Sequence, residues 1–427
     1  MRMSKKKEIF PKLRFWGYKS KWIIDRFNFE FLQTNSFSRA EMDNEKGSVK
    51  NIHYGDILTK YNDTLRDISV VPFVNKNIDL SRFGEESYLK NGDIVIADTA
   101  EDFTAGKAVE VLNIDFPILA GQHTFLCRPK INFAPGFMGY YLNSPSYHNR
   151  LILLLTGTKV YSISKANIKN TFILYPENYE EQQKIADCLS SIDELIDAET
   201  RKLTALEKYK KGLMQKLFPE EGKTLPEWRF PEFQDHDAWI KIMLGDISDV
   251  LMCKRIFANE TSEIGDVPFY KIGTLGGKAD SFISRALFEK YKKTYRFPRQ
   301  GEILISCSGT IGRCLPYDGE DAYYQDSNIV WIDNPTLLIS NELLLYLLSN
   351  VHWNKLNSTT ITRIYTSDLK KLILTFPENK DEQQKIADCL SAIDTMITEQ
   401  SNKVEQLKTH KKGLMQGLFP SLEEADV

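Results

Sequence analysis

The sequence predicts an α+β protein: two β-rich domains joined by two long helices, which form an antiparallel coiled coil with internal pseudo-two-fold symmetry. A 44-residue stretch occurs twice, from Pro176 to Pro219 and from Pro377 to Pro420, with about 27 identical positions at an offset of about 201 residues. The roughly 150 residues before each copy differ from one another. They contain short β-branched runs after Gly-acid turns, which are typical of strands.

Each copy of the repeat has the pattern of one long helix with a coiled-coil seam. Its apolar residues recur at alternating steps of four and three, the 3.5-residue period of such a seam. The seam residues are Ile185, Leu189, Ile192, Ile196, Leu203 and Leu206 in the first copy, and Ile386, Leu390, Ile393, Ile397, Val404 and Leu407 in the second. A narrow stripe on so long a helix needs a partner helix, and the other copy supplies one. An ordinary core helix in each domain is the alternative.

Signals at the ends and in the middle of the repeat support a long paired helix. Each copy begins with an Asn-x-x-Glu variant of the capping box, formed by Asn178 with Glu181 and by Asn379 with Glu382. The prolines at the far ends stop the helices. Four polar residues interrupt the seam: Glu199, Gln400, Lys210 and Lys411. Polar residues at seam positions can fix the register of the two helices.

Composition excludes several classes of protein. The chain has 427 residues, 42% of them hydrophobic, so it can bury the cores of two or three domains. Its longest apolar runs are far too short to span a bilayer, and the basic N-terminus lacks the apolar stretch of a signal peptide. We therefore expect a cytoplasmic protein. The six cysteines form no CxxC pair and the six histidines have no metal-ligand spacing, so no metal site is expected.

A polar loop precedes each long helix. The first loop, TGTKVYSISKANIKN, starts at Thr156, and the second, STTITRIYTSDLKK, starts at Ser358. Their Ser, Thr, Tyr, Lys and Arg side chains are the types that contact phosphates and base edges. A solvated turn that caps a strand is the alternative.

No catalytic motif is found. The chain has no Asn-Pro-Pro-aromatic run, no P-loop and no G-x-G-x-x-G between a strand and a helix. Asp98, Glu101 and Asp102 lie near Lys107 in a loosely nuclease-like group, for which a solvated acidic loop is the favoured interpretation. No catalytic residue is predicted.

The EQQKIADCLSxID…KKGLMQxLFP helix, repeated after each of two variable domains, resembles the specificity subunit of type I restriction–modification systems. The resemblance covers essentially the whole chain. It divides the chain into a first target-recognition domain (1–175), a first conserved long helix (176–219), a second target-recognition domain (220–376), a second conserved long helix (377–420) and an acidic tail (421–427).

The resemblance implies a non-catalytic DNA reader. Each domain would read one half of a bipartite, asymmetric site in double-stranded DNA, and the helix pair would set the gap between the halves. The helices would also dock two modification (methyltransferase) subunits, and restriction/translocation subunits would complete the complex. No cofactor is expected on this chain, since S-adenosylmethionine and ATP would bind to the partner subunits.

Candidate DNA-contacting residues follow from side-chain type and loop position, not from the resemblance. In the first domain they are His123, Lys159, Tyr161, Ser162, Ser164 and Lys165, and in the second they are Ser306, Ser308, Thr310, Arg313, Thr362, Arg363 and Tyr365. Arg313 and Arg363 suit bidentate contacts to guanine, and the lysines suit phosphates. Two other functions stay open: a self-contained DNA-modifying enzyme with a diverged active site, and a non-specific coiled-coil DNA-binding scaffold.

Overall fold

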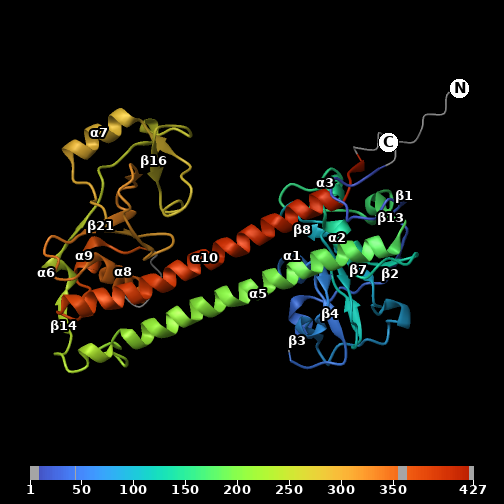
Figure 1. Cartoon of the computed structure of the whole chain (residues 1–427), viewed down its shortest axis with the longest axis horizontal. Helices are drawn as coiled ribbons and strands as arrows, with labels where there is room; N and C mark the ends of the chain where they lie inside the picture. The colour runs from blue at the N-terminus through green and yellow to red at the C-terminus, as the bar shows by residue number, and fades with distance from the viewer. Residues whose placement is uncertain (1–8, 44, 354–362, 423–427) are drawn as a thin grey trace. The chain divides into compact units, whose positions relative to one another are not determined.

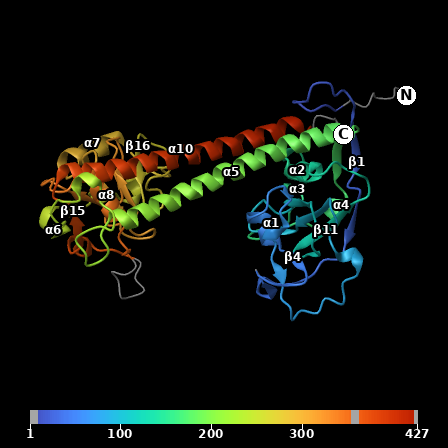
Figure 2. The ribbon, with the colours of Figure 1, turned by 60° about the horizontal axis from the view of Figure 1, so that its bottom comes forward.

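The computed structural model describes residues 9–43, 45–353 and 363–422. The chain divides into two compact units, one formed by Met1–Arg201 with Ser401–Val427 and the other by Lys202–Gln400. The two long helices, α5 (Tyr179–Leu217) and α10 (Lys380–Leu418), each contribute one half to each unit. Within each unit these halves lie side by side and run in opposite directions (Figures 1 and 2). Each unit therefore combines one domain with half of an antiparallel coiled coil.

The first domain is β-rich. Its strands form a five-stranded sheet (β2-β11-β7-β9-β5), a four-stranded sheet (β10-β4-β6-β3) and two strand pairs (β1-β13 and β12-β8). The strands are β1 (Trp22–Arg26), β2 (Phe29–Leu32), β3 (Met42–Asp43), β4 (Lys50–Ile52), β5 (Thr64–Leu65), β6 (Phe73–Val74), β7 (Asp93–Ala97), β8 (Thr99–Ala100), β9 (Ala108–Val111), β10 (Ile118–Ala120), β11 (Thr124–Pro129), β12 (Tyr161–Ser162) and β13 (Phe172–Pro176). The helices are η1 (Arg39–Glu41), α1 (Tyr54–Thr59), η2 (Ile68–Val70), η3 (Glu85–Ser87), α2 (Phe137–Asn143), α3 (Pro145–Ile152) and α4 (Lys165–Lys169).

The second domain repeats this plan with fewer strands among its described residues. Its sheets have the orders β15-β21-β18-β19, β17-β16-β20 and β14-β22. The strands are β14 (Ile240–Met243), β15 (Asp249–Leu251), β16 (Val267–Tyr270), β17 (Phe282–Ile283), β18 (Ile303–Ser306), β19 (Cys314–Pro316), β20 (Tyr323–Tyr324), β21 (Ile329–Asp333) and β22 (Ile373–Phe376). The helices are η4 (Pro231–Phe233), α6 (Leu244–Ile247), η5 (Ala258–Glu260), α7 (Arg285–Thr294), α8 (Asn341–Ser349) and α9 (Thr366–Lys370).

The Gly-acid turns lead into buried strands, as the sequence indicates. Gly92 has φ = 86° and Gly301 has φ = 85°, in the left-handed region that favours glycine. Asp93 then accepts a hydrogen bond from the backbone N–H of Lys90, and Glu302 accepts one from that of Arg299. Strands β7 and β18 follow directly and are buried throughout.

The predicted seam residues are all buried or half-buried. At the outer ends of the helices they belong to the cores of the domains. Ile185 and Leu189 join the core of the first unit, and Ile386 and Leu390 join that of the second. Each repeat also begins before its helix, since Pro176 is the last residue of β13 and Pro377 follows β22. The repeat is therefore the end of a strand, a turn and a helix, rather than a helix throughout.

Candidate nucleic-acid interface and repeated helix anchors

An arginine from the start of each domain anchors a long helix. The guanidinium group of Arg14 donates two hydrogen bonds, each of 2.8 Å, to the carboxylate of Glu181. Arg229 donates two of 2.7 Å to Glu382. Both glutamates are almost fully buried. Of the predicted capping boxes only half forms: Asn178 and Asn379 accept from the glutamates' backbone N–H groups, but the glutamate side chains turn to the arginines.

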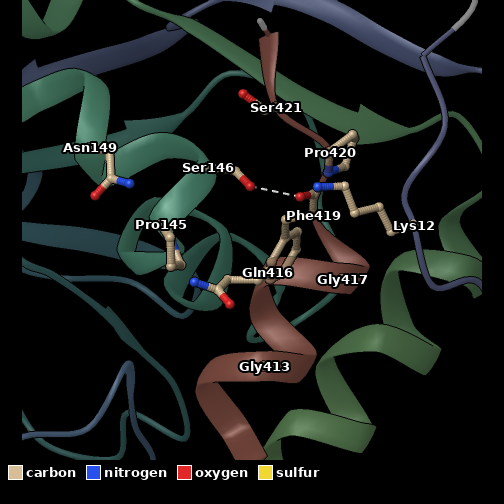
Figure 3. A pocket seen from close by; sticks show the side chains of 10 residues that line it. All are labelled: Lys12, Pro145, Ser146, Asn149, Gly413, Gln416, Gly417, Phe419, Pro420 and Ser421. Atoms are coloured by element: carbon tan, nitrogen blue, oxygen red, sulfur yellow. Dashed lines mark hydrogen bonds between the residues drawn. The ribbon is translucent and has the colours of Figure 1, made fainter. Parts of the chain in front are cut away.

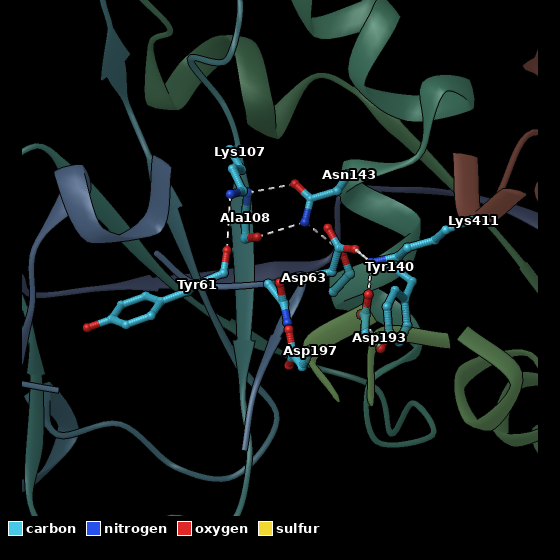
Figure 4. A network of polar contacts seen from close by, with 11 residues as sticks. Tyr61, Asp63, Lys107, Ala108, Tyr140, Asn143, Asp193, Asp197 and Lys411 are labelled. Carbon is cyan, nitrogen blue, oxygen red and sulfur yellow. Dashed lines mark hydrogen bonds and ion pairs between the residues drawn. The ribbon is translucent and has the colours of Figure 1, made fainter. Parts of the chain in front are cut away.

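A lysine from the second half of each long helix binds an aspartate of the other helix, and Figure 4 shows the pair of the first unit, Lys411 with Asp193. In the first unit, Lys411 contacts Asp193 and also Asp63 of the domain, whose carboxylate lies 2.6 Å from its Nζ. The hydroxyl group of Tyr140 donates to Asp193 at 3.0 Å. Burial lowers the pKa of Lys411, but the charges of Asp63 and Asp193 outweigh burial, so the pKa is raised. Lys411 is therefore a charged group held inside the first unit.

The second unit repeats this contact in a more open form. Lys210 lies 2.5 Å from Asp394, to which the hydroxyl group of Tyr346 donates at 2.9 Å. The side chain of Asp394 is 40% exposed, against 11% for Asp193. The same number of residues separates the aspartate from the lysine in both helices, so the two pairs specify one register. The predicted role of Lys210 and Lys411 at seam positions thus has a structural basis, and Glu199, one of the other two predicted polar positions, pairs with Lys403.

A cavity lies at the end of each long helix. In the first unit a cavity of about 490 Å³ lies between α3 and the end of α10, where the Ser146 hydroxyl donates to the carbonyl oxygen of Phe419 (Figure 3). In the second unit a cavity of about 1150 Å³ is lined by the end of α5 and by residues 349–352 at the end of α8. Gly413 and Gln416 line the first cavity. Gln215, the counterpart of Gln416, lines the second.

The polar loop of the first domain forms a short hairpin. Backbone hydrogen bonds of 2.9 and 2.8 Å join Thr156 and Ser162. Lys159 is exposed at the tip, and Tyr161 and Ser162 are half-exposed in β12, which pairs with β8. The hairpin therefore holds three predicted DNA-contacting residues, all at least partly exposed, within four positions of one another.

The remaining candidates of the first domain have structural partners. The Ser164 hydroxyl caps α4 by accepting from the backbone N–H of Asn167, and the ammonium group of Lys165 lies 4.8 Å from the ring centroid of Phe31. His123 is exposed in the left-handed conformation, with φ = 56°, and its Nδ1 lies 3.4 Å from Asp98. These side chains remain accessible, but part of their chemistry is used within the domain.

The candidates of the second domain gather at the end of β18. Thr310, Arg313 and Tyr365 are exposed, and Ser308 bridges to Arg363, whose Nη2 donates to the carbonyl oxygen of Ser327 at 2.8 Å. Ser306 is only 1% exposed, and its hydroxyl group bonds to the backbone of the same loop. This burial argues against the predicted DNA contact of Ser306, because the residue is the last of a buried strand. Thr362 lies outside the described residues.

Lys107 and Asp102, of the acidic group noted in the sequence, make hydrogen bonds within the first domain. The Lys107 ammonium group donates to the backbone carbonyl of Leu58 at 3.3 Å and to that of Tyr61 at 3.1 Å, the latter shown in Figure 4. Asp102 caps its own loop by accepting from the backbone N–H of Thr104. Within residues 9–43, 45–353 and 363–422, no group of three or more His, Cys, Asp or Glu side chains could hold a metal ion. The six cysteines, all described, are free. Cys188 and Cys389, at matching positions of the two repeats, are half-buried.

Glu110 of β9 takes the place of an N-cap for α2. Its buried carboxylate accepts from the backbone N–H groups of Gly136 at 2.7 Å and Gly139 at 2.8 Å. Burial raises the pKa of Glu110 to about 7, although both hydrogen bonds lower it. In the second domain the hydroxyl group of Ser340 caps the equivalent helix, α8. The first domain thus carries an ionisable group where the second carries a neutral one.

Glu110 should make the stability of the first unit depend on pH. Its pKa in the folded protein exceeds that of the unfolded chain, so its contribution is complete below about pH 4.5 and is lost as the pH rises through about 7. We expect the difference in unfolding free energy between the native protein and Glu110→Gln to change by about 3 kcal/mol between pH 4.5 and 7.5. Hydrogen–deuterium exchange of peptides from β9 measures this difference between the native protein and the variant, and peptides from α8 should show no pH-dependent difference. A constant difference would contradict the assignment.

The fold and these contacts define a class of protein in which a repeated long helix, with repeated anchoring contacts, carries two different domains. Comparison with known proteins gives the family. The family model described as the type I restriction modification DNA specificity domain matches residues 23–208 and 236–408. The chain belongs to this family of specificity subunits, whose role in the complex is specificity rather than catalysis.

Individual relatives of the chain carry the name of the same family. A Haemophilus influenzae protein that carries the name of a type I restriction enzyme specificity subunit is 35% identical over 315 residues, which cover 73% of this chain and 77% of that protein. A Methanocaldococcus jannaschii type I restriction enzyme specificity subunit is 27% identical over 279 residues, covering 61% and 64%. The crystal structure of a type I S subunit from M. genitalium shares the fold, with a TM-score of 0.58 at 16% identity, covering 96% of this chain and 99% of that one. In the part of the chain that the structure describes, no helix combines the length and apolarity needed to cross a membrane.

Proposed function

We propose that this chain is the sequence-specificity subunit of a cytoplasmic type I restriction–modification complex, and that it reads a bipartite, asymmetric DNA site with one half-site per domain. The observation that carries the proposal is the repeated anchoring: Arg14–Glu181 and Arg229–Glu382 attach two unlike domains to equivalent ends of two near-identical helices. Because the same arginine–glutamate contact attaches both domains, each domain is held on its long helix in the same way. Unlike loops imply unlike half-sites, so the site is not palindromic.

The helix pair would set the spacing of the half-sites. Each long helix has 39 residues, which gives a length of about 58 Å at 1.5 Å per residue. The crossed pairs Lys411–Asp193 and Lys210–Asp394, each within its own unit, support the proposed antiparallel pairing of the two helices.

The same helices would dock two copies of a methyltransferase subunit. Several side chains that are exposed or half-exposed are identical in the two copies of the repeat, although neither core requires them. They are Gln183, Lys184, Asp187, Lys211, Gly212 and Gln215, with their counterparts Gln384, Lys385, Asp388, Lys412, Gly413 and Gln416. Equivalent surfaces bind identical partners, as in symmetric assemblies. Restriction subunits would join the same complex, and S-adenosylmethionine and ATP would be bound by the partner subunits.

Lengthening both helices tests the proposal. Duplicating residues 196–202 in α5 together with 397–403 in α10 adds one heptad to each helix and preserves the seam and the crossed pairs. We expect the complex with the methyltransferase subunits to methylate the same two half-sites, separated by a spacer longer by no more than about three base pairs. Sequencing of methylated adenines in cells that carry the complex measures both properties.

The matched control duplicates residues 196–202 alone. This change shifts Lys210 away from Asp394, so we expect loss of assembly rather than a new spacer. Altered half-sites in the double duplication, or an unaltered spacer, would overturn the proposed ruler. Absence of sequence-specific methylation by the native complex would overturn the proposed function itself.

A further inference from the structure

Two neighbouring segments of the first domain expose large apolar side chains. Phe103 is 54% exposed, and Val160 is 52% exposed at the tip of the hairpin. The segments are joined, because Thr99 and Ala100 of β8 pair with Ser162 and Tyr161 of β12. The ring centroid of Phe103 lies 4.7 Å from that of Tyr161. Exposed apolar side chains gathered on one surface are typical of interaction sites.

This surface is preorganised. Gly157 has φ = 121°, and a Cβ atom there would lie 1.9 Å from the carbonyl oxygen of Val160, so the turn requires glycine. The carbonyl oxygen of Phe103 lies 2.9 Å from Nε2 of His148. A fixed tip loses little conformational entropy when it binds.

The chemistry of the surface suits base edges better than phosphates. Phosphate binding depends on clustered cations, but here the exposed Lys159 of the hairpin is accompanied by the exposed Glu101 of the segment that pairs with it. In the major groove, cytosine offers an amino donor to carboxylates, and thymine offers a methyl group to apolar side chains. The acceptors, the one cation and the apolar side chains of this surface together match the groups that base edges offer in the major groove.

We propose that the hairpin of residues 156–162 and the adjoining residues 98–104 form the base-reading element of the first domain, in which Val160 and Phe103 recognise thymine through its C5 methyl group. The inference rests on the proposed function and adds specificity-determining residues to it. In the second domain the equivalent pairing joins Ser308 to Arg363. A guanidinium group there favours guanine, so the two domains differ in the bases that they select.

Thymine analogues test the inference. Binding of the complex with methyltransferase subunits is measured on DNA duplexes that carry the site which the complex methylates. In these duplexes each thymine of either half-site is replaced in turn by 2′-deoxyuridine. For the native protein, at least one replacement in one half-site should weaken binding about fourfold, the effect of one buried methyl group. Val160→Ala and Phe103→Ala should each weaken binding to the thymine duplex. They should also reduce the penalty for deoxyuridine at that half-site alone.

Val70→Ala is the matched control, because Val70 is 57% exposed in η2 of the same domain. We expect it to retain the discrimination between thymine and deoxyuridine. If the Val160 and Phe103 variants still distinguished thymine from deoxyuridine as the native protein does, the inference would be overturned. An unchanged methylation pattern in these variants would then still support the proposed function. The inference would also be overturned if neither half-site contained thymine. It would be overturned too if the variants lost the methyltransferase subunits on size-exclusion chromatography, since the apolar surface of Val160 and Phe103 would then dock a protein.

Discussion

Lys411→Met is expected to destabilise the first unit by about 3–5 kcal/mol, the cost of removing one partner of a buried ion pair. Methionine fills a similar volume but leaves the carboxylates of Asp63 and Asp193 buried without their cation. Hydrogen–deuterium exchange of peptides from residues 179–201 and 401–418 should show the loss of protection, and urea denaturation gives the free energy.

The repeat supplies a matched control for this change. Lys210→Met removes the equivalent lysine from a pair whose aspartate is 40% exposed, and exposed pairs contribute about 0–1 kcal/mol. We expect a small loss of protection confined to residues 202–217 and 380–400. Equal effects of the two substitutions would show that Asp63 and the deeper burial of Asp193 contribute nothing.

Phe419→Ala should destabilise the first unit by about 3–5 kcal/mol, the usual cost of truncating a buried phenylalanine. Phe419 is 1% exposed, and its ring lies 5.7 Å from that of Tyr141, 5.8 Å from that of Phe137 and 6.5 Å from that of Trp22. The change lies at the far end of the sequence from the domain that it should weaken.

Phe218→Ala is the counterpart in the second unit, where Phe218 packs on Trp239 at 6.5 Å. It should lower the protection of peptides from the second domain and leave those of the first unchanged. If Phe419→Ala instead weakened the second domain, the assignment of the end of α10 to the first core would be wrong.

The long helices and their pairing were predictable because the signal is regular and occurs twice. The heptad period extends over the whole repeat, and the lysines at seam positions indicated a device that fixes register. Asp193 and Asp394 were missed, although both repeats carry them at the same distance from a lysine. Nothing in the sequence indicated Asp63, because its contact with Lys411 joins residues far apart in the chain.

The sheets were much less predictable. Their strands are two to six residues long, too short for a clear period, and β1 finds its partner only in β13. The candidate DNA-contacting loops show the same limit. Residue type and loop position selected exposed side chains such as Lys159 and Arg313, but they also selected Ser306, because burial at the end of a strand depends on tertiary packing. The apolar Val160 and Phe103 escaped a search based on polar side chains.

The end of α10 belongs to the first domain, and this has a consequence for biosynthesis. Leu418 and Phe419 are made about 240 residues after β13, the last strand along the chain with which they share a core. At about 5–20 residues per second, the ribosome takes roughly 12–50 s to supply them. The first domain emerges early but cannot close its core until Leu418 and Phe419 are made, whereas the second unit, formed by residues 202–400, has all of its segments earlier and can fold before it. Truncated nascent chains should therefore engage chaperones through their N-terminal half.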